Sequence, residues 1–275
     1  MTKAEIAKQT LEIIEAGHYE CNGKTVPIGL SAEQVKDVKV ISPSRVRECV
    51  ETADRGGFTK RASTEVYADS LETFESVRVN GKGKTIALNF ANAYHVGGGF
   101  LNGATAQEEN LCRLSTLYAS ISSDKAKEVY EHNKTTGMPT GSDYILISPT
   151  VAIFRDTDHS FLDKPIITSI VTSAAPDMRD DAADLTREQA AELMREKIKN
   201  VIAVCAAENA DTLVLGAWGC GAFGHNPKTV AGLFREVLFD RGYKNYFDRV
   251  VFSVYSPKGI LLSNTVNFIN VFGKK

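Results

Sequence analysis

Short apolar segments alternate with helix-like segments from residue 85 to residue 270, and this order constrains the fold more than any other feature of the sequence. The segments that we expect to form strands are residues 85–89, 144–147, 151–154, 166–172, 212–216 and 250–254. Three of them are continuous apolar runs, which is typical of strands that are covered on both faces. Helix start signals lie between them, in Thr186-Arg-Glu-Gln189 and in Asn226-Pro227. The alternation predicts a three-layer α/β/α fold around a largely parallel sheet.

The sequence offers no boundary between domains. Its 275 residues contain no repeat, no linker-like stretch and no block of like charge, and a compact α/β chain of this length can form one domain. Residues 3–17 and 45–53 have helical patterns. We therefore expect residues 1–275 to form a single domain in which about the first 62 residues are a helical elaboration.

The composition excludes several classes of protein. The 32 Lys and Arg residues and 34 Asp and Glu residues give a net charge of −2, and 43% of the residues are hydrophobic. Such a chain is neither disordered nor an electrostatic binder of bulk nucleic acid or of an anionic membrane. No apolar run approaches the roughly 20 residues that span a bilayer, and residues 1–16 lack the apolar core of a signal peptide. We expect a cytoplasmic protein that acts as a monomer.

The sequence shows no pattern that indicates a metal site. Its five cysteines are widely spaced, which fits reduced thiols. His95, His159 and His225 lie in separate loops, without the spacing of metal ligands. We expect no bound metal.

A glycine-rich loop follows the expected strand 85–89. Gly97, Gly98 and Gly99 are consecutive, and Gln107-Glu108-Glu109 follows. Residues without a Cβ allow the backbone to approach a ligand closely and to point its N–H groups at a phosphate. The alternative is a flexible turn that has no part in binding.

Glu108 and Glu109 stand at the start of an expected helix over residues 106–121. Thr105-Ala-Gln-Glu108 matches a capping box, so Glu108 has a structural alternative in which its carboxylate caps the helix. Glu109 has no such alternative. The helix dipole favours the charged form of a carboxylate there, whereas partial burial beside a sugar favours the neutral form. A glutamate under both influences is a candidate proton donor to a glycosidic oxygen.

A second glycine-rich loop follows the expected strand 212–216. It contains Gly219, Gly221 and Gly224 and ends at Asn226-Pro227, which are good residues for the start of a helix. A pyrophosphate here would meet free N–H groups and the positive end of a helix. The same glycines match the GxGxxG pattern of a Rossmann dinucleotide site, but Asn-Pro separates them from the helix. Both interpretations predict a ligand that resembles ADP.

Several of these segments together resemble the bacterial-type poly(ADP-ribose) glycohydrolases of the macrodomain superfamily. The resemblance rests on the glycine triplet followed by Gln-Glu-Glu in residues 97–109, and on residues 147–156, 172–176 and 215–224. It implies a macrodomain-like fold with a mixed, largely parallel sheet. It also implies hydrolysis of the ribose–ribose O-glycosidic bond of poly(ADP-ribose), releasing ADP-ribose without a cofactor. The implied partners are ADP-ribose or poly(ADP-ribose) chains on modified targets.

The resemblance also assigns roles to individual residues. Glu109 corresponds to the catalytic acid, Glu108 to a partner that contacts ribose hydroxyls, and Gln107 to a residue that holds the loop. The residues implied to contact the substrate are Asn89, Asn92, Gly97, Gly98, Gly99, Gly219, Cys220, Gly221, Ala222, Phe223 and Tyr255. Tyr255 is a candidate to stack on the adenine, with Phe252 as the competing aromatic residue.

Three other functions remain open at this point. The chain could remove single ADP-ribosyl groups from modified targets, or bind ADP-ribose without cleaving it, or use a nicotinamide cofactor as a dehydrogenase. The acidic pair favours an enzyme over a non-catalytic macrodomain. Because neighbours on one helical turn cannot easily face each other across a glycosidic bond, we expect one acid/base glutamate, with the other in a positioning role.

Overall fold

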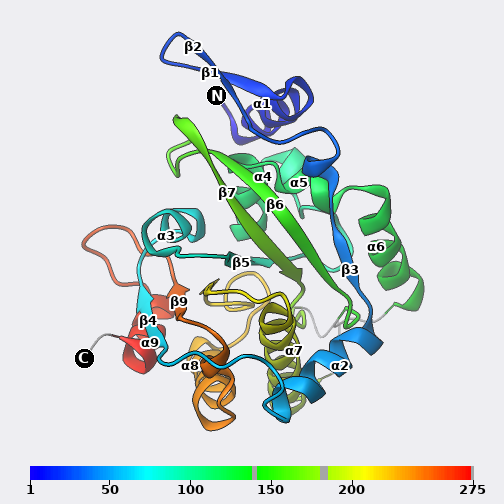
Figure 1. Cartoon of the computed structure of the whole chain (residues 1–275), viewed down its shortest axis with the longest axis vertical. Coiled ribbons are helices and arrows are strands. Elements are labelled where there is room, and N and C mark those ends of the chain that lie inside the picture. Colours follow the sequence, from blue (N-terminus) through cyan, green and yellow to red (C-terminus); the bar gives the residue numbers. More distant parts are fainter. Residues whose placement is uncertain (138–140, 180–184, 274–275) are drawn as a thin grey trace.

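The computed structural model describes residues 1–137, 141–179 and 185–273. In these residues seven strands form one sheet with the spatial order β3-β6-β7-β5-β8-β9-β4 (Figure 1). In that order they are Lys39–Ile41, Ile145–Arg155, Phe161–Ser173, Thr85–Phe90, Thr212–Leu215, Arg249–Ser253 and Glu65–Asp69. The strands from β7 to β4 pair in parallel, whereas β6 pairs antiparallel with β7 and with β3. The sheet is therefore mixed and largely parallel, which confirms the expected fold class.

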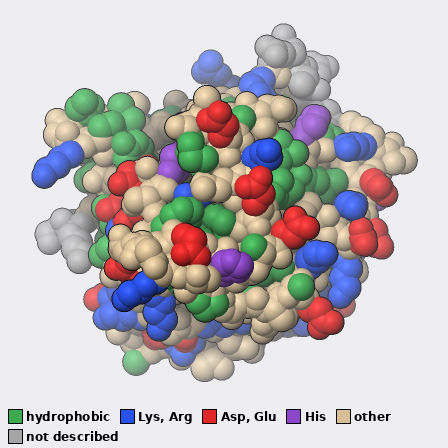
Figure 2. Space-filling view, turned by 90° about the horizontal axis from the view of Figure 1, so that it is seen from above, with side chains coloured by type: hydrophobic (Ala, Val, Ile, Leu, Met, Phe, Trp, Pro, Cys, Tyr) green, Lys and Arg blue, Asp and Glu red, His purple; other side chains and the backbone are tan. Residues whose placement is uncertain are grey.

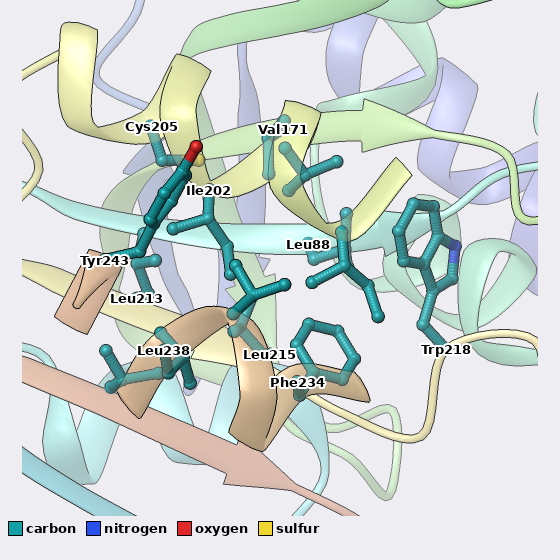
Figure 3. Close-up of a cluster of buried hydrophobic side chains, with 14 of the residues drawn as sticks. Leu88, Val171, Ile202, Cys205, Leu213, Leu215, Trp218, Phe234, Leu238 and Tyr243 are labelled. Atoms are coloured by element: carbon teal, nitrogen blue, oxygen red, sulfur yellow. The ribbon is translucent and has the colours of Figure 1, made fainter. Parts of the chain in front are cut away.

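Helices cover both faces of this sheet. The helices on one face are α2 (Pro43–Asp54), α7 (Arg187–Ala207), α8 (Pro227–Arg235) and α9 (Ser263–Phe272). Those on the other are α1 (Lys3–Ala16), α3 (Thr73–Asn80), α4 (Gln107–Leu114), α5 (Leu117–Ile121) and α6 (Asp124–Thr136). Successive side chains of a strand point to opposite faces, so Leu213 and Leu215 pack under α7 and α8 (Figure 3), and Val214 packs on the opposite layer.

The start signals of two helices are confirmed. The side chain of Thr186 accepts a hydrogen bond from the N–H of Gln189, and Oε1 of Gln189 accepts one from the Thr186 N–H; α7 begins after this capping box. Asn226 caps α8 differently, since its Oδ1 accepts hydrogen bonds from the N–H groups of Lys228 and Thr229, and Pro227 is the first residue of the helix. No described helix is long and apolar enough to cross a membrane. On the face shown in Figure 2, acidic and basic side chains lie among one another.

The first 62 residues are less helical than expected. Strands β1 (His18–Cys21) and β2 (Lys24–Pro27) form an antiparallel hairpin next to α1, and β3 belongs to the main sheet. Apolar residues of the hairpin pack against Ala152 and Phe154 of β6 in a small third cluster of buried side chains. Helical periodicity in α1 is visible in the sequence, whereas a four-residue strand gives too short a pattern to recognise.

The helix expected over residues 106–121 is broken into α4 and α5. Ser115 adopts an extended conformation and forms a β-bridge with Ile153, and the N–H of Thr116 donates to the carbonyl of Ala152. Ser115 Oγ donates to the carbonyl of Leu111 and accepts from the N–H of Leu117, so it links the ends of the two helices. This contact with β6 is a tertiary interaction, which local periodicity does not report.

We propose that the chain folds as a single domain, and a substitution in the hairpin tests this. Tyr19 is buried, stacks on Phe161 with ring centroids 5.1 Å apart and donates to the carbonyl of Leu162. Tyr19→Ala should lower the free energy of unfolding by about 3 kcal/mol. Fluorescence of Trp218, the single tryptophan of the chain, should report the loss. The exposed control Val79→Ala should leave the transition unchanged. An unshifted Trp218 transition in Tyr19→Ala would mean that the hairpin belongs to a separate unit.

Candidate active site

A cavity of about 650 Å³ opens at the carboxyl end of the parallel strands. Its walls come from the segments that follow β5, β8, β9 and β4, together with the first turn of α4. This edge of an open α/β sheet is where ligands bind as a rule. Of the residues expected from the sequence, those that line the cavity are Asn92, Gln107, Glu108, Glu109, Gly219, Gly221, Ala222, Phe223 and Tyr255. The others, Asn89, Gly97, Gly98, Gly99 and Cys220, do not line it.

Glu109 is a nearly buried carboxylate with one unoccupied oxygen. Its side chain is 8% exposed, and its Oε1 accepts a hydrogen bond of 2.9 Å from the N–H of Gly99. Its Oε2 is buried and has no hydrogen-bond partner among the described residues. A buried carboxylate oxygen without a partner is costly. Because Glu109 lines the cavity, Oε2 is a polar atom of its wall whose hydrogen-bonding capacity the described residues leave unmet.

The glycine triplet is packed against this carboxylate. A Cβ on Gly98 would lie 2.4 Å from Oε1 of Glu109 and 3.3 Å from Oε2 of Glu108, and Gly98 has a φ of +57°. A Cβ on Gly97 would lie 2.8 Å from the ring of Tyr118. The loop is therefore a close-packed turn rather than only a flexible one, and both carboxyl groups lie against the same glycine.

Glu108 is held by two donors and does not cap the helix. Its Oε1 accepts from Nδ2 of Asn89 at 3.1 Å, and its Oε2 accepts from the N–H of Asn92 at 2.9 Å. Burial raises the pKa of Glu108 to about 8, against the effect of these hydrogen bonds and with a smaller upward effect from the charge of Glu109. The capping-box alternative is wrong, because α4 begins at Gln107 and its N-cap residue, Ala106, makes no side-chain cap.

Gln107 joins the start of α4 to β5. Its Oε1 accepts from the N–H of Phe90 at 2.9 Å, and its Nε2 donates to the carbonyl of Leu88 at 2.7 Å. Strand β8 pairs with β5 only as far as Ala87. The side chain of Gln107 therefore occupies the backbone groups that β8 leaves open, and it fixes the two glutamates next to the end of the strand.

The second glycine loop presents backbone donors to the cavity. The N–H groups of Gly221, Ala222 and Phe223 donate to no described residue, although the turn around them is closed by other backbone bonds. Gly219 has a φ of +76° and packs on the ring of His225, where a Cβ would lie 2.8 Å from Cδ2. Gly224 lies outside α8, unlike the third glycine of a Rossmann fingerprint. Three free N–H groups before a helix N-terminus form a site for an anion.

Cys220 contributes no reactive group to the cavity. Its sulfur donates to the carbonyl of Trp218 at 3.6 Å, and burial raises the pKa of its thiol to about 12. The thiol is therefore protonated at neutral pH, which disfavours a cysteine nucleophile.

The two candidate aromatic residues differ in exposure. Tyr255 is 52% exposed and lines the cavity. Phe252 is fully buried and stacks on Phe272 of α9, with ring centroids 4.1 Å apart. Phe252 is therefore part of the core, and its suggested competition with Tyr255 was wrong.

Two cavity residues were missed in the sequence. Glu72 follows β4 and accepts a 2.6 Å hydrogen bond from Nδ2 of Asn110, and burial, followed by the charge of Glu75, raises its pKa. The guanidinium of Arg179 lies 5.2 Å from the ring centroid of Phe223. Glu72 follows β4, and only the strand order shows that the segment after β4 reaches the same edge of the sheet as the segments after β5, β8 and β9.

Comparison with known proteins identifies the family of this chain. Residues 7–156 match the family model described as the catalytic domain of microbial-type PARG. The chain belongs to the microbial-type poly(ADP-ribose) glycohydrolases. The match covers more than half of the chain, and it confirms the family that the glycine triplet and the Gln-Glu-Glu sequence indicated.

Solved structures of this family have the same fold. Poly(ADP-ribose) glycohydrolase from Thermomonospora curvata is 33% identical, with a TM-score of 0.88 over 98% of this chain and 99% of that chain. The same enzyme bound to the inhibitor ADP-HPD matches with a TM-score of 0.86 and 32% identity over the same shares of the two chains. The enzyme from Deinococcus radiodurans in complex with ADP-ribose is 32% identical, with a TM-score of 0.77 over 87% of this chain and 95% of that chain. A comparison with curated proteins gave no match.

The contact between Gly98 and Glu109 can be tested directly. In Gly98→Ala the new methyl group should displace the Glu109 carboxylate, in a backbone conformation that already disfavours alanine. Because Glu109 is the proton donor expected from the sequence, we expect its displacement to lower the glycohydrolase rate about 100-fold or more. Gly232→Ala in α8, where a Cβ would meet nothing within 4 Å, is the matched control and should keep full activity. Full activity in Gly98→Ala would contradict the packing described above.

The raised pKa of Glu108 predicts a pH dependence of stability. A carboxyl whose pKa rises from 4.5 to about 8 on folding stabilises the protein fully below pH 4.5, and this contribution is lost as the pH rises to about 8. The loss is on the order of 5 kcal/mol. Glu108→Gln cannot ionise and does not lose this contribution. The free energy of unfolding of Glu108→Gln, minus that of wild type, should therefore increase from pH 5 to pH 9. The exposed control Glu51→Gln should show a constant difference. A constant difference for Glu108→Gln as well would mean that Glu108 is charged in the fold.

Proposed function

We propose that this chain hydrolyses the ribose–ribose O-glycosidic bond of poly(ADP-ribose) and releases ADP-ribose, with Glu109 as its single acid/base residue. The observation that carries the proposal is the free Oε2 of Glu109, held in the wall of a nucleotide-sized cavity by the bond between Oε1 and Gly99. The membership of the family and the complexes of its relatives with ADP-ribose and an inhibitor support it.

The arrangement of donors suggests how the substrate lies. The N–H groups of residues 221–223 and the N-terminus of α8 would bind the diphosphate. The ribose beside it would then lie next to Glu109. The transition state of glycoside hydrolysis resembles an oxocarbenium ion, which the neighbouring diphosphate can stabilise.

Glu109 would act twice in this reaction. It gives a proton to the glycosidic oxygen as the bond to the anomeric carbon breaks, and then takes a proton from the water that attacks that carbon. One group can serve both steps, because the first leaves it as a carboxylate. The bond from the Gly99 N–H holds this carboxylate in place throughout.

Glu108 is suited to a positioning role rather than to nucleophilic attack. Both of its oxygens accept hydrogen bonds, from Asn89 and from the backbone of Asn92, and a pKa of about 8 keeps it mostly neutral at pH 7. A neutral carboxyl is a poor nucleophile. We propose that Glu108 fixes the turn at Asn92, where the substrate ribose would lie, and that Tyr255 contacts the adenine.

Two properties expected from the sequence stay predictions. These are the monomeric state and the cytoplasmic location. Sedimentation of the purified protein and microscopy of a tagged chain would test them.

Glu109→Gln tests the proposal most directly. The amide oxygen of glutamine can still accept the bond from Gly99, but the side chain cannot transfer a proton. Release of ADP-ribose from defined poly(ADP-ribose) chains should therefore fall about 1,000-fold, within the range of general acid–base catalysis. The affinity for ADP-ribose, measured by calorimetry, should stay within about threefold of wild type, because the diphosphate loop is unchanged. Glu51→Gln is the matched exposed control and should keep full activity.

The same assay distinguishes the alternatives. Equal release from wild type and Glu109→Gln would remove Glu109 from its role. Cleavage of single ADP-ribosyl groups but not of the polymer would favour the mono-ADP-ribosyl hydrolase. Binding of ADP-ribose by wild type without any release would favour a non-catalytic macrodomain.

A further inference from the structure

A buried arginine lies one helical turn beyond Glu109. Arg113 of α4 is 0% exposed, and its Nη1 donates a 2.6 Å hydrogen bond to the carbonyl of Ala104. Its Nε and Nη2 are buried and have no partner among the described residues. A buried guanidinium with two unused donors destabilises the fold unless something offsets its desolvation. Its position beside the acid/base residue suggests why it is retained.

Three hydrogen bonds connect Arg113 to Glu109 through the glycine loop. Nη1 of Arg113 donates to the carbonyl of Ala104, the N–H of Ala104 donates to the carbonyl of Gly99 at 3.1 Å, and the N–H of Gly99 donates to Oε1 of Glu109. Helix α4 joins Glu109 and Arg113 covalently and completes the ring. The turn between Gly99 and Ala104 is tight, because a Cβ on Gly99 would lie 2.6 Å from the Cβ of Ala104. A change at Arg113 is therefore transmitted to the bond that orients the carboxylate.

The two side chains also interact through their charges. Burial lowers the pKa of the Arg113 guanidinium, and the negative charge of Glu109 acts in the opposite direction. The two charges therefore attract each other inside the fold. Of the other titratable groups, Cys112 on α4 and His159 in the turn after β6 interact with Arg113 through their charges, and Glu108 and Cys112 interact with Glu109.

We propose that Arg113 is a positioning residue for the hydrolysis, which anchors the turn that orients Glu109 and supplies the buried positive charge that stabilises its carboxylate after proton transfer. The inference rests on the proposed role of Glu109. Helix α1 also contacts this end of α4, since Oγ1 of Thr10 donates a 2.8 Å hydrogen bond to the carbonyl of Arg113.

Arg155 provides a matched control. It is a second buried arginine, 4% exposed, with an unpartnered Nε, and it also binds α1, through Oε1 of Gln9. Its Nη1 donates to the carbonyl of His159. Arg155 has no hydrogen bond to the glycine loop, so Arg155→Met measures what the loss of a buried arginine at this interface does by itself.

The experiment compares Arg113→Met, Arg113→Lys and Arg155→Met for kcat, KM and the pH profile of kcat/KM. In Arg113→Met, kcat should fall about 10- to 100-fold while KM stays within about threefold, because the diphosphate loop is untouched. An acid catalyst loses activity as it deprotonates, so loss of the positive charge should move the alkaline limb of the profile to higher pH. Arg113→Lys keeps the charge but not the planar fork, so its kcat should fall several-fold with the alkaline limb in place. Arg155→Met should lose thermal stability without moving the limb.

Specific outcomes would overturn the inference. An unshifted alkaline limb in Arg113→Met, with a kcat no lower than that of Arg155→Met, would make Arg113 a purely structural residue. If Arg113→Met does not fold, a wild-type kcat in Arg113→Lys would reject the role of the bond to Ala104. These results are separable from the role of Glu109. Inactive Glu109→Gln together with an unshifted Arg113→Met would leave the proposed function standing and remove only Arg113.

Discussion

The hydrogen bond from the Gly99 N–H to Oε1 of Glu109 connects the two parts of the molecule that the site requires, the loop after β5 and the first turn of α4. It forms only because the backbone at Gly98 approaches the carboxylate to a distance at which any Cβ would collide with it. The glycine triplet is therefore a steric requirement of the carboxylate position. Because the loop has no Cβ at these positions, its backbone N–H can approach the Glu109 carboxylate more closely than a residue with a side chain would allow.

The sheet determines where this contact lies. Strand β5 is paired on both sides at its start, but β8 leaves it after Ala87, while β7 continues to Phe90. The backbone groups of Leu88 and Phe90 that β8 leaves open are taken by the side chain of Gln107. In this way the first residue of α4 is joined to the end of a central strand, and the two residues after it face the cavity. The second glycine loop reaches the same edge because β8 runs parallel to β5.

Local signals in the sequence predicted much of this arrangement. The apolar runs, the capping box at Thr186 and the Asn226-Pro227 pair depend on neighbours a few residues apart, and each is found in the structure. The features that were missed depend on contacts across the chain. The break at Ser115 comes from its pairing with Ile153, and the cavity position of Glu72 comes from the neighbouring order of β9 and β4. The capping-box pattern before Glu108 had the right residues, but Asn89 and Asn92 hold that carboxyl instead.

The two adjacent glutamates illustrate how surroundings rather than sequence position assign chemical roles. Both belong to the first turn of one helix and feel the same helix dipole, so that factor cannot distinguish them. Glu108 is enclosed and no cation acts on its pKa, so burial favours the neutral form even though each of its oxygens accepts a hydrogen bond. Glu109 has a donor on one oxygen only, and a buried guanidinium lies one turn away. In the proposed reaction Glu109 gives up a proton and later takes one from water, and its Oε2 has no other hydrogen bond to lose in either step. Both oxygens of Glu108 already accept hydrogen bonds that hold the loop.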